Sequence, residues 1–108
     1  MGTVGTQSWR ESAWRKRAAE LLRREGLLRG SISLRRQACG KPNCRCVRGE
    51  KHQAMYVVYR QGGRLHQLYV PRERQARVRQ WVARHGEVRA LLEKLSALYA
   101  GRVRRRRE

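Results

Sequence analysis

The sequence is poor in acidic side chains and contains no aspartate at all. Its 108 residues hold 27 lysines and arginines against 8 glutamates, which gives a formal net charge of +19 at pH 7. Without aspartate or a paired acidic motif, the chain lacks the carboxylate cluster that a two-metal nuclease uses to bind magnesium. We therefore expect no catalytic residues, and a protein that is not an enzyme.

Phenylalanine is absent and aromatic residues make up only 6% of the chain, so the apolar core must be modest. Long hydrophobic runs are also absent. No stretch approaches the length of a membrane span, and residues 1–30 contain no continuous apolar run like that of a signal peptide. We expect one small domain with no membrane partner. Cytoplasmic residence fits cysteines that must stay reduced.

Cysteine is scarce, but its three occurrences lie close together. Cys39, Cys44 and Cys46 precede His52 in the spacing Cys-x4-Cys-x-Cys-x5-His. Three thiolates and one imidazole make a complete tetrahedral ligand set for structural zinc. We predict one Zn²⁺ bound by these four residues, with His66 or a water as alternatives to His52. Because the cysteine count is odd, a closed disulfide set is disfavoured, and free thiols are the competing interpretation.

The basic excess indicates a polyanionic partner, because self-repulsion at this net charge destabilises a compact monomer. Codon bias would explain the preference for arginine over lysine, but it does not explain the shortage of acids. Nucleic acid is the polyanion that clustered arginines bind best. The candidate phosphate contacts are Arg10, Arg17, Arg24, Arg35, Arg36, Lys41, Arg45, Arg48, Lys51, Arg60, Arg104, Arg105, Arg106 and Arg107.

Three segments of the first seventy residues carry clear secondary-structure patterns. Ser8 followed by Glu11 is typical of a capping box, and it predicts a helix over residues 9–25 with Gly26 as its C-cap. Residues 30–35 alternate apolar and polar side chains, which predicts a strand leading into the cysteine segment. Residues 55–60 and 64–70 predict a hairpin with a two-residue turn at Gly62-Gly63.

The hairpin register assigns a role to each of its faces. It places Val57, Tyr59, Leu68 and His66 on one face, where we expect Val57, Tyr59 and Leu68 to be buried. The other face carries Tyr56, Arg60 and Tyr69, a combination of aromatic and basic side chains. Such a face can stack nucleobases. It can equally cover the first helix, and the sequence leaves both interpretations open.

From Arg72 the apolar spacing changes to three and four residues and continues in phase across Gly86. It predicts one long helix to about Leu98. We expect Leu91, Leu92, Leu95 and Leu98 to pack on the first helix or on the same helix of a second chain. The predicted fold class is α+β, with an N-terminal helix, a small antiparallel sheet bearing the zinc-type loop, and this C-terminal helix. The predicted organisation is a disordered segment at 1–7, a single zinc-stapled domain at 8–100 and a basic tail at 101–108.

The centre of the chain resembles a known family. The features that carry the resemblance are the strand at 30–34, the block Cys-Gly-Lys-Pro-Asn-Cys-Arg-Cys at 39–46, Gly-Glu-Lys-His at 49–52 and Tyr-Val-Pro at 69–71. Together with the long helix they cover about residues 28–99. The family is a group of small prokaryotic proteins of unknown function, often encoded within or beside mobile elements. The resemblance implies zinc-type ligation and a mobile-element setting, and it implies no activity. Family members follow the histidine with Gly-Pro-Tyr, whereas this chain has Gln-Ala-Met-Tyr at 53–56.

These observations predict a non-enzymatic, zinc-stabilised nucleic-acid-binding protein. The mobile-element resemblance favours DNA over RNA as the partner. Little in the sequence indicates base reading, since it has neither a helix-turn-helix pattern nor a two-Cys, two-His finger. The alternative is an accessory subunit whose long helix forms a homodimer or docks on a larger recombinase, transposase or nuclease.

Overall fold

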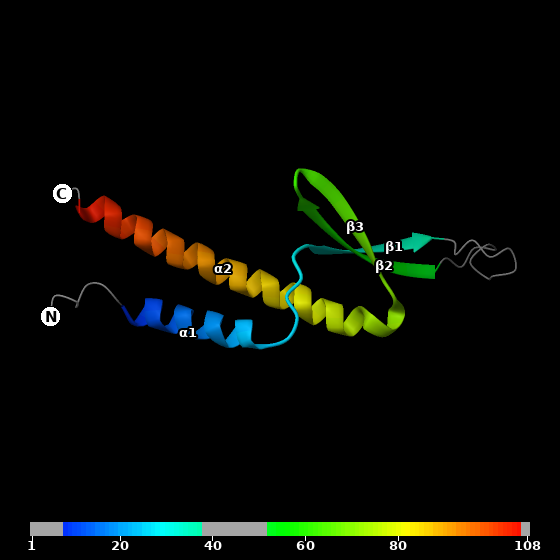
Figure 1. Cartoon of the computed structure of the whole chain (residues 1–108), viewed down its shortest axis with the longest axis horizontal. Coiled ribbons are helices and arrows are strands. Elements are labelled where there is room, and N and C mark those ends of the chain that lie inside the picture. The colour runs from blue at the N-terminus through cyan, green and yellow to red at the C-terminus, as the bar shows by residue number, and fades with distance from the viewer. Residues whose placement is uncertain (1–7, 38–51, 107–108) are drawn as a thin grey trace, which may run out of the picture. The chain divides into compact units, whose positions relative to one another are not determined.

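The computed structural model describes residues 8–37 and 52–106, and residues 1–7, 38–51 and 107–108 lie outside the described part. Its elements, in chain order, are α1 (Trp9–Arg23), β1 (Ser31–Gln37), β2 (His52–Gln61), β3 (Arg64–Val70) and α2 (Gln75–Arg106) (Figure 1). The predicted α+β class, with an N-terminal helix, an antiparallel sheet and a long C-terminal helix, is confirmed.

The chain divides into two compact units by its internal contacts. The first, here called the helical unit, comprises residues 1–27 and 83–108. The second, the sheet unit, comprises residues 28–82. Each unit has its own buried cluster of apolar side chains, so each is described separately below.

The hairpin forms at the predicted turn. Gly62 and Gly63 have φ angles of 61° and 79°, and two successive positive φ values are the mark of a type I′ turn. Residues with a Cβ rarely adopt these angles, whereas glycine adopts them without steric cost. The resulting register pairs Tyr59 with His66 and Val57 with Leu68, as the sequence predicts.

The sheet has the order β1-β2-β3, and both strand pairs are antiparallel. One face of the central strand β2 carries Met55 and Val57, which are fully buried. Val70 of β3 and Val78 of α2 complete this cluster, and further half-buried apolar side chains pack around it. Those side chains are Leu28, Ile32, Tyr59, Trp81 and Val82. Side chains on the opposite face of the sheet alternate with these, because successive residues of a strand point to opposite sides.

Burial on the core face does not include all of its apolar side chains, and the prediction that Leu68 is buried is wrong. Leu68 is 45% exposed, although its partner Val57 is fully buried, and Leu34 on the other edge strand is 47% exposed. The apolar side chains of α2 in the sheet unit pack on the cluster that contains Met55 and Val57 of the central strand. Val70 of the edge strand β3 belongs to this cluster, whereas Leu68 and Leu34 share its face but lie outside it.

The connection from α1 to the sheet ends in a glycine that the packing requires. Gly30 has a φ of 141°, and a Cβ placed there would lie 2.7 Å from Val57 Cγ1 and 2.8 Å from the Val58 carbonyl oxygen. Both the backbone angle and the missing side chain are therefore needed where the chain enters β1 beside the central strand.

Helix α1 begins where the sequence predicts and ends slightly earlier. The Ser8 hydroxyl accepts a hydrogen bond from the Glu11 amide at 3.2 Å, so Ser8 is the N-cap. The last helical residue is Arg23 and the C-cap is Arg24, whose amide donates to the Leu21 carbonyl. The expected C-cap, Gly26, instead takes its positive φ of 94° in the connection that follows.

Helix α2 is one continuous helix, as predicted, and it runs through Gly86. It follows a 3₁₀ turn at Arg72–Arg74, and it continues beyond the expected end at Leu98 to Arg106. Much of the basic stretch after Gly101 is therefore helical. None of the described helices is long and apolar enough to cross a membrane.

The helical unit is an antiparallel helix pair formed by α1 and the second half of α2. Its buried cluster consists of Ala18 and Leu21 from α1 with Val88 and Leu91 from α2, and Trp14 packs against it. Packing of Leu91 on the first helix is thus confirmed. Leu95 and Leu98 are half-buried, whereas Leu92 is 57% exposed and does not pack on the first helix. Its packing on a second chain stays a prediction. Leu22 of α1 is also exposed, at 56%.

Candidate nucleic-acid interface and metal loop

The face of the sheet opposite Met55 and Val57 carries an aromatic and basic cluster formed by Arg35, Tyr56 and Tyr69. The guanidinium carbon of Arg35 lies 4.3 Å from the centroid of the Tyr56 ring, which is a cation–π contact. The Tyr56 and Tyr69 rings meet edge to face, with centroids 5.7 Å apart and an interplanar angle of 66°. Tyr69 is 55% exposed, so solvent reaches much of its ring. We call these three residues the tyrosine platform.

The strand register explains how residues far apart in sequence form the platform. Tyr56 pairs with Ser33 of β1 on one side and with Tyr69 of β3 on the other. Arg35 stands two residues after Ser33 on the same face, within diagonal reach of the Tyr56 ring. Its Nε also donates a long hydrogen bond of 3.4 Å to the Ser33 hydroxyl. Each of the three strands therefore supplies one member of the platform.

A second basic site lies near the hairpin end of the sheet. A guanidinium nitrogen of Arg29 donates to the Arg60 carbonyl oxygen, which ties the connection before β1 to the end of β2. Both residues are exposed. They line an open pocket of about 320 Å³ whose other walls are Leu28, Tyr59 and Gln61. Arg60 was a candidate from the sequence, whereas Arg29 was not.

The predicted zinc ligands Cys39, Cys44 and Cys46 lie outside the described residues. Among the described residues, no group of three or more His, Cys, Asp or Glu side chains could hold a metal ion. The strands do locate the two ends of the cysteine segment. Gln37, the last residue of β1, pairs with His52, the first residue of β2. The two described residues that flank positions 38–51 are therefore neighbours in the sheet.

His66, the alternative ligand, lies elsewhere on the sheet. It pairs with Tyr59, seven residues along β2 from His52, which corresponds to about 23 Å at 3.3 Å per residue. Its ring stacks on that of Tyr59, with centroids 5.1 Å apart and an interplanar angle of 12°. These contacts are those of a histidine packed on the core face of the sheet.

The structure distributes the remaining basic candidates over both units. Arg36 of β1 is exposed on the face opposite Arg35. In the helical unit, Arg10 lies 5.5 Å from the Trp9 ring centroid, and Arg24, Arg104 and Arg105 are exposed. Arg106 is the last residue of α2. The candidates outside the described residues are Lys41, Arg45, Arg48, Lys51 and Arg107.

Arg17 is the one described candidate whose guanidinium group is engaged by carboxylates. Its Nε donates to Glu87 at 2.8 Å and its Nη1 donates to Glu20 at 2.9 Å. The hydrogen bond from Arg17 lowers the pKa of Glu87 below its usual value. Within this arrangement Arg17 links α1 to α2, and a phosphate would have to compete with two carboxylates for it.

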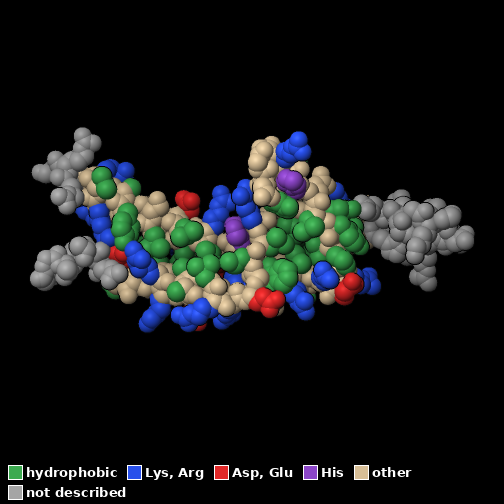
Figure 2. Space-filling model, viewed as in Figure 1, with side chains coloured by type: hydrophobic (Ala, Val, Ile, Leu, Met, Phe, Trp, Pro, Cys, Tyr) green, Lys and Arg blue, Asp and Glu red, His purple; other side chains and the backbone are tan. Residues whose placement is uncertain are grey.

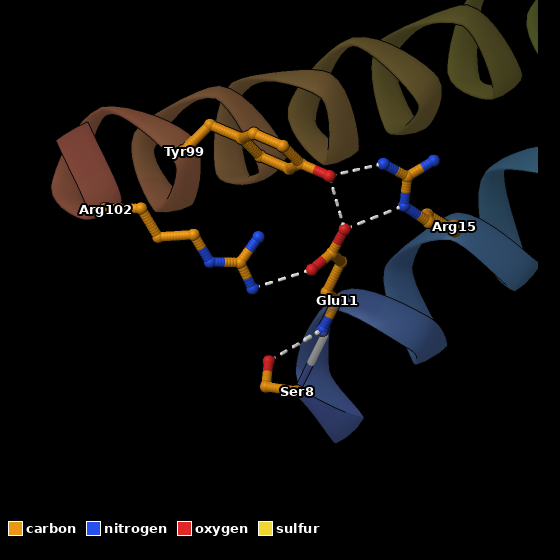
Figure 3. A network of polar contacts seen from close by, with 5 residues as sticks. All are labelled: Ser8, Glu11, Arg15, Tyr99 and Arg102. Atoms are coloured by element: carbon orange, nitrogen blue, oxygen red, sulfur yellow. Dashed lines mark hydrogen bonds and ion pairs between the residues drawn. The ribbon is translucent and has the colours of Figure 1, made fainter. Parts of the chain in front are cut away.

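Glu11 is buried between the two helices, which no pattern in the sequence indicates. Its side chain is 1% exposed and accepts hydrogen bonds from the Tyr99 hydroxyl at 2.5 Å and from Arg102 at 2.7 Å (Figure 3). Arg15 donates to it at 3.0 Å and also donates to the Tyr99 hydroxyl at 2.6 Å. These bonds, led by those of Tyr99 and Arg102, lower the pKa of Glu11 to about 2. The glutamate was expected only to cap α1.

Arg84 plays a comparable structural role that the sequence pattern did not reveal. Its Nη1 donates to the carbonyl oxygens of Glu25 and Gly26, at 2.8 Å to the latter. It thereby satisfies carbonyl groups beyond the C-terminal end of α1. An arginine on the helical repeat of α2 looks the same in sequence whether it binds phosphate or a carbonyl from another element.

Comparison with known protein families adds one finding to this geometry. A family model matches residues 9–80, two thirds of the chain. The chain belongs to the family described as Domain of unknown function (DUF6788). The resemblance to a family of unknown function is confirmed at that level. No curated protein and no solved structure shows a significant match.

The DUF6788 match runs from the first residue of α1, through the whole sheet, into the first turns of α2. It therefore includes the tyrosine platform and the cysteine segment. Residues 81–106, which form the larger part of α2, follow the matched segment. The description of DUF6788 assigns no activity, so function must be argued from the chemistry of the side chains.

Proposed function

We propose that this DUF6788 protein is a non-enzymatic nucleic-acid-binding protein whose sheet carries a zinc-stabilised cysteine loop. The tyrosine platform is the observation that carries the proposal. An exposed tyrosine beside an arginine-stacked tyrosine offers a π surface for a nucleobase and a cation for the adjoining phosphate. Basic side chains elsewhere on a chain of net charge +19 supply the non-specific attraction to the backbone.

The location of the platform links it to the cysteine segment. Arg35 lies two residues before Gln37, where that segment begins, and Tyr56 lies four residues after His52, where it ends. Lys41, Arg45, Arg48 and Lys51 belong to the segment between them. Phosphate contacts from these four residues would therefore extend the basic surface from the same end of the sheet.

Zinc ligation by Cys39, Cys44, Cys46 and His52 is part of the proposal. The pairing of Gln37 with His52 supports it, because the two residues that flank the cysteines lie opposite one another in the sheet. Of the two histidines, His52 is favoured, since His66 pairs with Tyr59 about 23 Å away along β2. A structural ion at this place would reinforce a sheet unit that buries few large side chains.

DNA is proposed as the partner over RNA, on the mobile-element setting that the sequence resemblance implies. Zinc ligation by the cysteine motif and the mobile-element setting are both proposals for this chain. Because base stacking tolerates every base, we expect little sequence preference and a better fit to unpaired strands than to a closed duplex.

The deciding experiment compares two adjacent arginines that carry the same charge on opposite faces of β1. Fluorescence anisotropy with single-stranded DNA, duplex DNA and RNA of equal length would be measured for the full chain. Arg35→Gln should weaken single-strand binding by about tenfold, and Tyr69→Ala by a similar factor. Arg36→Gln removes the same charge away from the platform and should cost only about two- to threefold.

The outcomes separate the proposal from a purely electrostatic attraction. Equal reductions in affinity for Arg35→Gln and Arg36→Gln would show that net charge alone binds nucleic acid and that the platform has no part. No binding of any of the three nucleic acids at low salt would contradict the function as a whole.

A further inference from the structure

The helical unit exposes an apolar strip that its own core does not use. Leu22 of α1 is 56% exposed, and Leu92, Tyr99 and Val103 of α2 are 57%, 42% and 65% exposed. Exposed leucines are ordinary when scattered singly, but a contiguous strip indicates an interaction surface. We call these four residues the apolar strip.

Helix geometry places the strip along one edge of the interface between α1 and α2. Leu22 follows the buried Leu21, and Leu92 follows the buried Leu91, so each is turned about 100° away from the core. In an antiparallel pair of right-handed helices, residues that follow a core position lie on the same edge of both helices. The contact of Arg15 with Tyr99 confirms this, since each follows a position of the packed seam.

The three residues of the strip on α2 have the spacing of residues on one face of a helix. Leu92, Tyr99 and Val103 recur at intervals of seven and four residues, which keeps them on one side of the helix. Figure 2 shows hydrophobic side chains gathered along α1 and the second half of α2, with most Lys and Arg side chains at the edges. All three residues follow the segment that the DUF6788 model matches.

The charges around the strip determine which partner it suits. Arg15 is 52% exposed beside Tyr99, and Arg89 is exposed three residues before Leu92 on α2. Among the described glutamates of the unit, Glu11 binds Arg15, but it shares its one carboxylate with Arg102, so this group keeps one uncompensated positive charge. Glu20 and Glu87 bind Arg17, and both Arg17 and Glu87 precede core positions and so lie at the opposite edge. The remaining described glutamates are Glu25, which follows the C-cap of α1, and Glu93, turned a further 100° round α2 from Leu92.

We propose that the apolar strip binds an amphipathic helix of another protein whose apolar face is flanked by acidic side chains. Leucines of that helix would cover Leu22 and Leu92, and its carboxylates would meet Arg15 and Arg89. A second copy of this chain is disfavoured, because it would bring the same arginines against one another. Nucleic acid is disfavoured too, since phosphates do not cover leucine side chains.

The test uses the full chain and a synthetic probe of defined chemistry. The probe is a labelled peptide of about three heptads with leucine at positions a and d and glutamate at e and g. Fluorescence anisotropy at physiological salt should give a Kd of about 10 μM or tighter. Two control peptides, one with lysine in place of glutamate and one with the same composition scrambled to remove the apolar face, should bind at least about tenfold more weakly.

Matched variants locate the binding surface. Leu22→Glu and Leu92→Glu should each weaken binding of the acidic peptide by about tenfold or more, because each places a carboxylate in the apolar strip. Leu65→Glu is the control, since Leu65 is 52% exposed in the sheet unit and the charge change is identical. It should change the Kd by less than about twofold.

Each alternative occupant gives its own signature and would overturn the proposal. Equal binding of the acidic and scrambled peptides, or an equal reduction in affinity for Leu65→Glu, would reduce the effect to net charge. A dimer in sedimentation velocity that Leu92→Glu converts to monomer would assign the strip to a second copy. A protein that binds anionic vesicles through Leu22 and Leu92, but not the acidic peptide, would assign it to a lipid surface.

Discussion

The hydroxyl of Tyr99 donates a 2.5 Å hydrogen bond to the carboxylate of Glu11, although 88 residues separate the two in the chain. Glu11 stands in the first turn of α1, and Tyr99 stands near the end of α2. The bond therefore joins the two helices at one end of the antiparallel pair. Because Arg15 and Arg102 donate to the same carboxylate, its negative charge is satisfied while its side chain is buried.

This arrangement predicts a pH-dependent contribution to stability. The folded pKa of Glu11, about 2, lies below its usual value of 4.5. A lowered folded pKa means that the stabilisation is complete above about pH 4.5 and is lost as the pH falls towards 2. Glu11→Gln should lower the melting temperature by several degrees at pH 6, and the difference from the original chain should shrink through that window. Circular dichroism melts from pH 6 to 2 would measure it.

The control for this prediction is Glu20→Gln, which removes a glutamate that is 52% exposed from the same helix. Its effect on the melting temperature should be small, because exposed ion pairs contribute little. A Glu11→Gln difference that stayed constant from pH 6 to pH 2 would contradict the role assigned to the carboxylate.

Alanine substitutions at Gly30 and Gly86 should change the free energy of unfolding in opposite directions. Gly30→Ala forces a Cβ to within 2.8 Å of the Val58 carbonyl at a positive φ, and we expect a loss of about 2–4 kcal/mol in the free energy of unfolding. Gly86 lies inside α2 with no neighbouring atom within 4 Å of the new Cβ. Gly86→Ala should therefore stabilise by about 0.5–1 kcal/mol. Urea unfolding of both variants would test the pair, and a destabilising Gly86→Ala would mean that helix α2 bends there in solution.

The zinc prediction concerns Cys39, Cys44, Cys46 and His52. Elemental analysis of the purified chain should find about one equivalent of zinc, and Cys44→Ser should lose most of it together with the folded signal of the sheet. Strong chelators should have the same effect on the original chain. His66→Ala should retain the metal, whereas His52→Ala should bind it more weakly. A well-folded chain that contains no metal would disprove the site.

The end of α2 should add affinity for nucleic acid without selectivity. Arg104 and Arg105 are exposed on its final turns. Replacing both with alanine should weaken binding to every sequence alike and reduce the slope of log K against log salt by about 2, because each phosphate that is no longer neutralised lowers the slope by about 1. Anisotropy titrations between 50 and 200 mM salt would give the slope, for which binding to about six phosphates predicts roughly a thousandfold decrease in affinity. An unchanged slope would show that Arg104 and Arg105 make no phosphate contacts.

The sequence alone predicts the structure correctly where a local pattern decides it. The Gly62-Gly63 pair predicts a turn with two positive φ angles, and the alternation around it then sets the strand register. Ser8 before an apolar helix predicts the N-cap, and an unbroken three-four spacing predicts a single α2 through Gly86. In each case the determining interactions are between residues close together in the chain.

Sequence patterns mislead where burial depends on how elements pack. Leu68 shares a face with Val57 and with Val70 of its own strand, yet only Val70 joins the cluster that contains Val78 of α2, and Leu68 is 45% exposed. Leu22 and Leu92 match the apolar repeat of their helices, but the core takes Leu21 and Leu91, one residue earlier. A repeat of three and four residues marks a broad apolar side of a helix and does not say which half of it a partner covers.

The same division holds for the candidate sites. The sequence by itself determined the excess of positive charge, the metal-type spacing of three cysteines and a histidine, and the aromatic and basic face of the hairpin. Only the tertiary structure brought Arg35 of β1 onto the Tyr56 ring, and buried Glu11 under Tyr99 and Arg102. Composition and short-range spacing are properties of the chain, whereas these contacts join residues up to 91 positions apart. They arise only because strand pairing and helix packing bring distant segments together.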